Sequence, residues 1–123
     1  MYLANDAALK LEELGFSKTY YENEIAPFDF YEYDKQEWVI GGCVVPYGNL
    51  LAPNHIYEQG TWLPSLCDLM YWLADKGYTY TLECKERGHG FVVRVTDSSG
   101  KIIKGKGGTA EYALFKVIEQ ILG

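Results

Sequence analysis

The second half of the chain carries the pattern that most constrains the fold, because two helical signals there enclose three β signals. Ser65 and Asp68 have capping-box spacing just before an apolar run, and the Lys-Gly pair at 76–77 is typical of a helix end. Residues 110–122 place apolar side chains on one stripe of a helix that Thr109 can cap. Three β-prone segments lie between these helices: YTYTLEC (78–84), FVVRVT (91–96) and KIIK (101–104). This order predicts an α+β fold in which two helices cover an antiparallel meander sheet, α-β-β-β-α.

The first half shows the same element types in a looser pattern. A helix is expected from an N-cap at Asn5 or Asp6 to Leu14, and Gly15 can supply its left-handed C-terminal cap. The β-prone segments that follow predict an α-β-β unit, with a further strand as an option: 19–21, 28–33 and 37–45. Residues 34–36 have the composition of a turn between the last two strands.

Residues 46–61 separate the two halves, because they hold two prolines, two glycines and two asparagines. We therefore predict one compact domain over 1–123, with an acidic aromatic part at 1–45, a connecting loop at 46–61 and the α-β-β-β-α part at 62–123. The chain has no apolar run of membrane-spanning length and no signal-peptide pattern, so we expect a cytoplasmic protein without a membrane partner. The three cysteines suggest buried thiols and no disulfide framework.

Charge is distributed unevenly along the chain, whose net charge is −6. Residues 1–62 carry ten acids and three bases, whereas residues 63–123 carry seven acids and eight bases. The acidic character therefore belongs to the first half, where it repels nucleic acid and attracts basic partners.

Acids and aromatics are concentrated from Tyr20 to Trp38, a stretch with six acids, one base and seven aromatic residues. In a strand over 28–33, alternation places Phe28, Phe30, Glu32 and Asp34 on one side and Asp29, Tyr31 and Tyr33 on the other. One interpretation is an edge hairpin whose carboxylates prevent strand-to-strand aggregation. The other is an interface in which aromatics anchor a partner and carboxylates bind its arginines. The interface residues that we predict are Phe30, Tyr31, Glu32, Tyr33, Asp34 and Glu37.

The sequence offers no residue set with the spacing of a catalytic or metal site. Its two histidines, His55 and His89, lie in loop-like segments, and no cysteine or histidine pair completes a four-ligand site. We therefore expect no enzymatic activity, no cofactor and no metal.

The run GKIIKGKG, residues 100–107, approaches the phosphate-binding P-loop pattern but ends in glycine where that pattern requires serine or threonine. It still predicts an anion-binding turn at the start of the last helix, formed by Lys104, Lys106, Gly107, Gly108 and Thr109. The alternative is a flexible strand-to-helix turn with solvated lysines.

Short motifs along residues 60–122 resemble a known domain family. They are the WLPS segment at 62–65, the KGY segment at 76–78, the FVV segment at 91–93 and the GTA segment at 108–110. Together they look like the small "ABA sandwich" domains of bacteriophage and prophage proteins, although the last helix is richer in large apolar residues than is usual there. This resemblance implies a phage origin and an α-β-β-β-α fold, with no established chemistry.

The same half is also similar to double-stranded-RNA-binding domains. The segment GHGFVVRV, residues 88–95, resembles the glycine-histidine loop and second strand of that family. Those domains place a lysine cluster on the first turn of the last helix, whereas this helix opens with Thr-Ala-Glu-Tyr-Ala at 109–113. The departure and the net charge of −6 make nucleic-acid binding the weaker expectation.

These observations predict a small non-enzymatic protein of a phage or other mobile element. We expect it to bind and inhibit or modulate a host protein, such as a nucleic-acid-handling defence protein, by placing its acidic aromatic surface in a basic groove. Two alternatives are a nucleic-acid binder that uses Arg87, His89, Lys104 and Lys106 as one stripe, and a binder of small anions such as nucleotides near Thr109. A second copy of the chain is a further possible partner.

Overall fold

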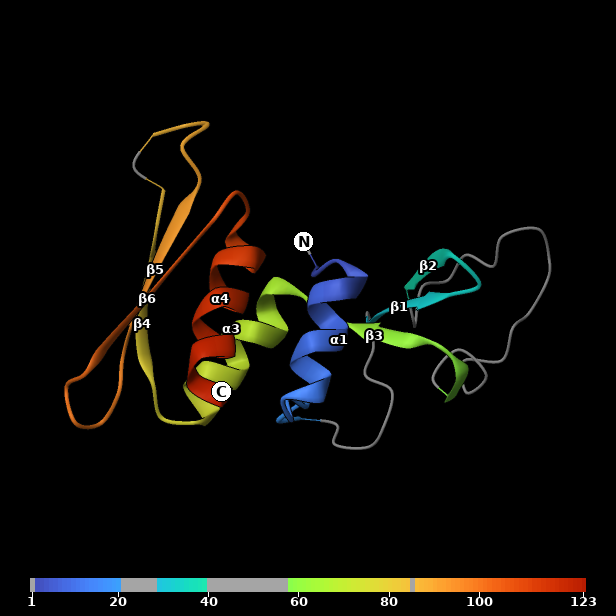
Figure 1. The fold of residues 1–123 in the computed structure, drawn as a ribbon, viewed down its shortest axis with the longest axis horizontal. Helices are drawn as coiled ribbons and strands as arrows, with labels where there is room; N and C mark the ends of the chain where they lie inside the picture. The colour runs from blue at the N-terminus through green and yellow to red at the C-terminus, as the bar shows by residue number, and fades with distance from the viewer. Residues whose placement is uncertain (1, 21–28, 40–57, 85) are drawn as a thin grey trace.

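A computed structural model describes residues 2–20, 29–39, 58–84 and 86–123. These residues form α1 (Asn5–Glu13), β1 (Phe30–Tyr33), β2 (Gln36–Val39), β3 (Thr61–Leu63), α3 (Leu66–Asp75), β4 (Thr79–Glu83), β5 (Phe91–Thr96), β6 (Ile102–Gly107) and α4 (Ala110–Leu122). The predicted α+β class is confirmed. Figure 1 shows two antiparallel sheets at opposite ends of the molecule, with the helices between them.

The sheet of β4, β5 and β6 is the predicted meander, with its strands in sequence order. Strand alternation turns Val93 and Val95 toward α3 and α4, and both valines are fully buried. The opposite face, which carries Arg94 and Lys104 in register, has no helix over it in the described part of the chain (Figure 1). The helices therefore cover one face of this sheet, as the sequence predicts.

Strand β6 continues beyond the predicted KIIK segment, so the interpretation of residues 104–107 as a flexible turn is wrong. The reason is a close approach between this strand and α4. A Cβ atom on Gly105 would lie 2.6 Å from the Ala113 carbonyl oxygen, and one on Gly107 would lie 2.7 Å from the Ala113 nitrogen. Glycine at alternate positions thus lets the helix backbone rest on the strand.

The ends of the helices follow the local signals in the sequence at most positions. Ser65 forms the predicted capping box of α3 with Asp68, and the Thr109 side chain accepts a hydrogen bond from the Tyr112 amide. Gly15 and Gly77 adopt φ values of +95° and +86° after their helices. At α1 the predicted N-cap is wrong, because the helix already starts at Asn5 with Ala4 as N-cap.

The second sheet has the order β2-β1-β3, and its third strand is not the one predicted. The described part of the 19–21 segment, Thr19 and Tyr20, forms no strand, whereas Thr61–Leu63 pairs with β1. This pairing also moves the boundary of the connecting loop, because Thr61 and Trp62 now belong to the N-terminal sheet. Residues 40–57, most of the predicted loop and the end of the predicted 37–45 strand, lie outside the described residues.

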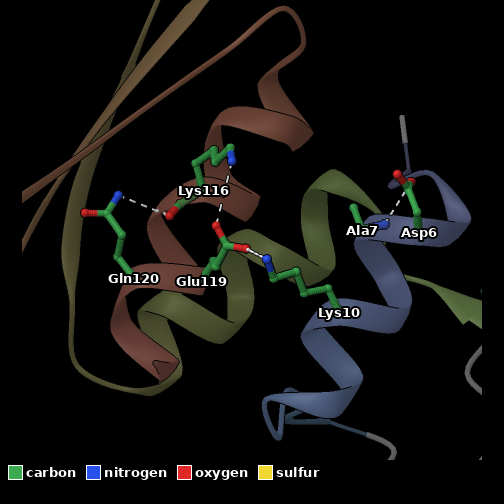
Figure 2. A network of polar contacts seen from close by, with 6 residues as sticks. All are labelled: Asp6, Ala7, Lys10, Lys116, Glu119 and Gln120. Carbon is green, nitrogen blue, oxygen red and sulfur yellow. Dashed lines mark hydrogen bonds and ion pairs between the residues drawn. The ribbon is translucent and has the colours of Figure 1, made fainter.

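One hydrophobic core joins the two halves. It combines Leu3, Leu11 and Phe16 from the first half with Leu69 and Leu114 from the second. At its edge, Lys10 of α1 and Glu119 of α4 form an ion pair of 2.8 Å (Figure 2). The Gln120 side chain donates hydrogen bonds to the carbonyl groups of Lys116 in its own helix and Lys104 in β6. These contacts place α4 between α1 and the C-terminal sheet.

Two further expectations concern the cysteines and the membrane. Cys67 and Cys84 are exposed free thiols, so the expectation that they are buried is wrong, and Cys43 lies outside the described residues. Cys67 lies in the first turn of α3, on the side of the helix away from the buried Leu69 and Leu73. None of the helices in the described ranges has both the length and the apolar character required to cross a bilayer.

Candidate functional site

The predicted interface residues lie on a hairpin formed by β1 and β2. A two-residue turn of Asp34 and Lys35 connects the strands, with φ values of +52° and +60°. Two consecutive left-handed residues define the tight turn that matches the twist of paired strands. The predicted turn is therefore confirmed at these two residues, while Gln36 already belongs to β2.

Three carboxylates gather at the end of this hairpin, and we call Glu32, Asp34 and Glu37 the acidic tip. The register places Glu32 of β1 directly opposite Glu37 of β2, and Asp34 lies in the turn between them. Asp34 and Glu37 are exposed, and Glu32 is half-buried. None of the three forms an ion pair with any described residue. Like charges in directly opposed positions destabilise a strand pair.

The aromatic residues of the hairpin are divided between its two faces. Tyr31 lies opposite Trp38 on one side and Trp62 on the other, and these rings form a small second core with Tyr33. Tyr31 has a relative exposure of only 1%, so the expectation that it is part of an exposed surface is wrong. The third strand contributes to this burial, because the Trp62 side chain packs against Tyr31.

Phe30 packs toward the main core of the molecule. It is half-buried and stacks on Tyr2 at a centroid distance of 4.5 Å. Of the six predicted interface residues, Tyr31 is buried, Phe30, Glu32 and Tyr33 are half-buried, and Asp34 and Glu37 are exposed. Trp38, which the prediction omitted, is half-buried beside them and donates its indole N–H to the Tyr33 carbonyl at 3.2 Å.

Behind the hairpin lies a buried ion pair that the sequence analysis missed. Lys18 follows α1, Asp29 precedes β1, and their side chains form an ion pair with exposures of 8% and 3%. The Lys18 ammonium group also lies 5.4 Å from the centre of the Trp62 ring. The sequence gives no signal for this pair, because the two residues are eleven positions apart and no local pattern links them.

A second buried carboxylate, Asp68, lies near this ion pair at the start of α3. Its side chain accepts hydrogen bonds from the Ser65 amide at 2.8 Å and from the Tyr20 hydroxyl. Burial raises the pKa of the Asp68 carboxyl, while the Ser65 hydrogen bond and the positive charge of Lys18 act in the opposite direction. Lys18, Asp29, Asp68 and Tyr20 thus connect the N-terminal sheet to α3.

The predicted anion-binding residues are only partly brought together. Lys106, Gly107 and Gly108 line one hollow, together with His89 from the β4–β5 loop. Lys104 lies on the outer face of β6, opposite Arg94, and does not line it. Thr109 does not line it either, and its side chain caps α4. Three of the five predicted residues therefore line the hollow. Lys104 and Thr109 do not, whereas His89, Gly88 and Gly90, which were not predicted, do.

Neither surface contains a recognisable metal centre. Across the described ranges, no group of three or more histidine, cysteine, aspartate or glutamate side chains is arranged to hold a metal ion. Comparisons with models of known protein families, with curated proteins and with solved structures give no match. The function must therefore be inferred from the geometry of the surfaces themselves.

Proposed function

We propose that this protein binds a basic protein partner through the acidic tip and the adjacent Tyr33. The observation that carries the proposal is the position of Glu32 directly opposite Glu37, with neither carboxylate in an ion pair with any residue that the structure describes. Such a pair costs the hairpin about 0.2 to 1 kcal/mol. A site that opposes folding in this way is typical of a surface selected for binding rather than for stability.

The chemistry of the tip defines the kind of partner. Ionised carboxylates accept paired hydrogen bonds from an arginine guanidinium, so a partner with arginines spaced along a groove would neutralise the tip. The half-buried Tyr33 and Trp38 supply rigid apolar surface beside the charges. Arginines bind carboxylates much as they bind the phosphates of nucleic acid. The partner that we propose is therefore a host protein whose basic groove normally holds nucleic acid. Occupation of the groove by the acidic tip would inhibit that protein.

A pull-down with matched charge variants tests this proposal. Tagged wild type is incubated with nuclease-treated bacterial lysate, beside Glu32→Gln/Glu37→Gln and the control Glu12→Gln/Glu13→Gln. Glu12 and Glu13 are exposed on α1, so the control removes the same charge from another surface. We expect wild type and control to retain a protein that the tip variant loses. Its binding should weaken steeply between low and high salt.

The stability of the same variants sharpens the test. Removing the opposed charges should raise the free energy of unfolding of Glu32→Gln/Glu37→Gln by about 0.2 to 1 kcal/mol, while binding is lost. Opposite changes in stability and binding are the signature of a functional surface. A tip variant that keeps its partner but aggregates, as measured by light scattering, would instead assign the carboxylates to protection of the sheet edge and overturn the proposal.

A further inference from the structure

The hollow at the end of the β5–β6 pair is the second feature of interest, and it is independent of the acidic tip. Its volume is about 470 Å³, within the range of small-molecule sites. The lining residues come from the β4–β5 loop, the start of β5 and the end of β6: Gly88, His89, Gly90, Phe91, Val92, Lys106, Gly107 and Gly108. It therefore lies at the end of the β5–β6 pair where Phe91, the first residue of β5, is opposite Gly107, the last residue of β6.

Glycines give this hollow its shape. Gly88 and Gly90 have φ values of +87° and +80°, a conformation that residues with a Cβ atom rarely adopt. A Cβ atom on Gly90 would also lie 2.7 Å from the Gly107 carbonyl oxygen, so the loop backbone passes directly against the end of β6. A Cβ atom on Gly108, by contrast, would meet no atom within 4 Å. Four of the eight lining residues are thus glycines, which expose backbone rather than side chains to the hollow.

The charged groups at the hollow are mainly basic. Lys106 lines it and forms no ion pair with the described residues. His89, from the β4–β5 loop, also lines the hollow. Its Nδ1 is 3.3 Å from a carboxylate oxygen of Glu86, and both side chains are largely exposed. Residues 79–107, which include the whole sheet, carry six bases and three acids. This region is therefore locally positive although the whole chain has a net charge of −6.

We propose that this hollow binds the phosphate group of a small phosphorylated ligand. Lys106 supplies the positive charge, His89 a second hydrogen-bond donor, and the glycine backbone permits close approach. Val92, which lies opposite Lys106 in the register, provides apolar surface for the remainder of the ligand.

Lys104 provides a matched charge control for the test of this proposal. Lys104 and Lys106 lie two positions apart on the same strand, and both side chains belong to its outer face. Only Lys106 lines the hollow. The variants Lys106→Gln and Lys104→Gln therefore remove the same charge from the same sheet, and differ in whether the lost charge belongs to the site.

The experiment is a titration of the ¹⁵N-labelled full chain with inorganic pyrophosphate and, separately, with ATP, followed by amide chemical shifts. We expect shifts concentrated at Gly88, Gly90, Gly107 and Gly108. Lys106→Gln should weaken binding roughly ten- to hundredfold, as expected for loss of a hydrogen bond between charged groups. Lys104→Gln should change the affinity about twofold or less, because solvent screens a charge outside the site. The unliganded spectra verify that both variants are folded.

The two probes distinguish the sources of phosphate. Equal affinity for pyrophosphate and ATP supports a site for the phosphate group alone. Tighter binding of ATP, with additional shifts at Phe91 and Val92, supports a nucleotide. Absence of shifts at the four glycines with either probe overturns the proposal. Equal loss of affinity in Lys104→Gln and Lys106→Gln also overturns it, because it assigns binding to the charged sheet face as a whole, as a nucleic-acid backbone would require.

Discussion

The C-terminal sheet pairs strands that follow one another in sequence, whereas the N-terminal sheet recruits β3 from beyond the predicted connecting loop. The two sheets also differ in charge. The β1–β2 hairpin, residues 30–39, carries three acids and one base, and residues 79–107 carry six bases and three acids. Because the sheets lie at opposite ends of the molecule (Figure 1), the chain presents an acidic end and a basic end. The two surfaces for which binding is proposed are therefore separate.

The sheets are also held to the helices by different interactions. At the C-terminal sheet, glycines in β6 let α4 pack directly on the strand backbone. At the N-terminal sheet, the buried pair of Lys18 and Asp29 lies beside Trp62. Close packing of a helix on a strand does not depend on any single polar group. A buried ion pair does, because the loss of one partner leaves the charge of the other buried. The three predictions below test this difference, from the largest expected effect to the smallest.

The largest effect should follow from breaking the buried ion pair. Lys18→Met leaves the Asp29 carboxylate buried without its ammonium partner, so the free energy of unfolding should fall by about 3 to 5 kcal/mol. Urea denaturation followed by tryptophan fluorescence measures the change. The control is Lys10→Met, which breaks the exposed ion pair with Glu119 and should leave the unfolding midpoint close to wild type.

The double variant Lys18→Met/Asp29→Asn distinguishes the buried charge from lost packing. It should recover part of the stability, because asparagine removes the buried negative charge. If Lys18→Met is no more destabilised than Lys10→Met, the N-terminal sheet is not anchored by this pair and the contrast with the C-terminal sheet fails.

A smaller effect should follow from overpacking the C-terminal sheet. Gly105→Val introduces a Cβ atom 2.6 Å from the Ala113 carbonyl oxygen and 2.7 Å from the Val117 side chain, which forces α4 away from β6. We expect a loss of about 2 kcal/mol in the same urea experiment. Gly108→Ala is the matched control and should change stability by less than about 0.5 kcal/mol, because its Cβ atom meets nothing within 4 Å. Equal losses in both variants would show that close helix packing does not depend on Gly105.

The smallest effects concern pH, and they should have opposite signs at two aspartates. Burial raises the pKa of Asp68, so its ionisation opposes folding, and the stability of Asp68→Asn relative to wild type should increase as pH rises above about 4. Hydrogen bonds from the Ser99 side chain and from the Lys101 and Ser99 amides lower the pKa of Asp97 in the β5–β6 turn. The advantage of wild type over Asp97→Asn should therefore be present above about pH 4 and disappear at lower pH.

Urea titrations of wild type and both variants at several pH values between 3 and 7 measure these differences. Among the described residues, Tyr20 and Ser65 bind the Asp68 carboxylate and Lys18 acts on it through its charge, while Ser99 and Lys101 act on Asp97. Parallel pH dependence in the two variants would mean that the surroundings of the two aspartates do not differ as the structure indicates.

The sequence predicted the parts of the fold that depend on residues close together in the chain. The capping box of Ser65 and Asp68, the cap at Thr109 and the left-handed glycines 15 and 77 are all local interactions. The hairpin turn at Asp34 and Lys35 belongs to the same group. For the candidate interface, the sequence placed the acids correctly on a hairpin, because alternation and turn composition are sufficient to locate a tight strand pair.

Apart from the N-cap of α1, the main errors concern contacts between distant segments. Tyr31 is buried in a cluster that includes Trp62 from β3, and no pattern within residues 28–33 reports that neighbour. The glycines at 105 and 107 suggest a flexible turn by composition, but they serve the approach of α4. His89 joins Lys106 at one hollow only because β5 and β6 pair in the register that brings Phe91 opposite Gly107.

The amino-acid sequence by itself determined the helices of the described chain, the meander and the location of the acidic residues, because caps, turns and periodicity act over a few neighbouring positions. Tertiary structure alone decided which aromatic residues remain accessible, which lysine lines the hollow and which charges are buried as a pair. These properties depend on strand register and helix packing between segments that are far apart in the chain, and such contacts exist only after the whole core has formed.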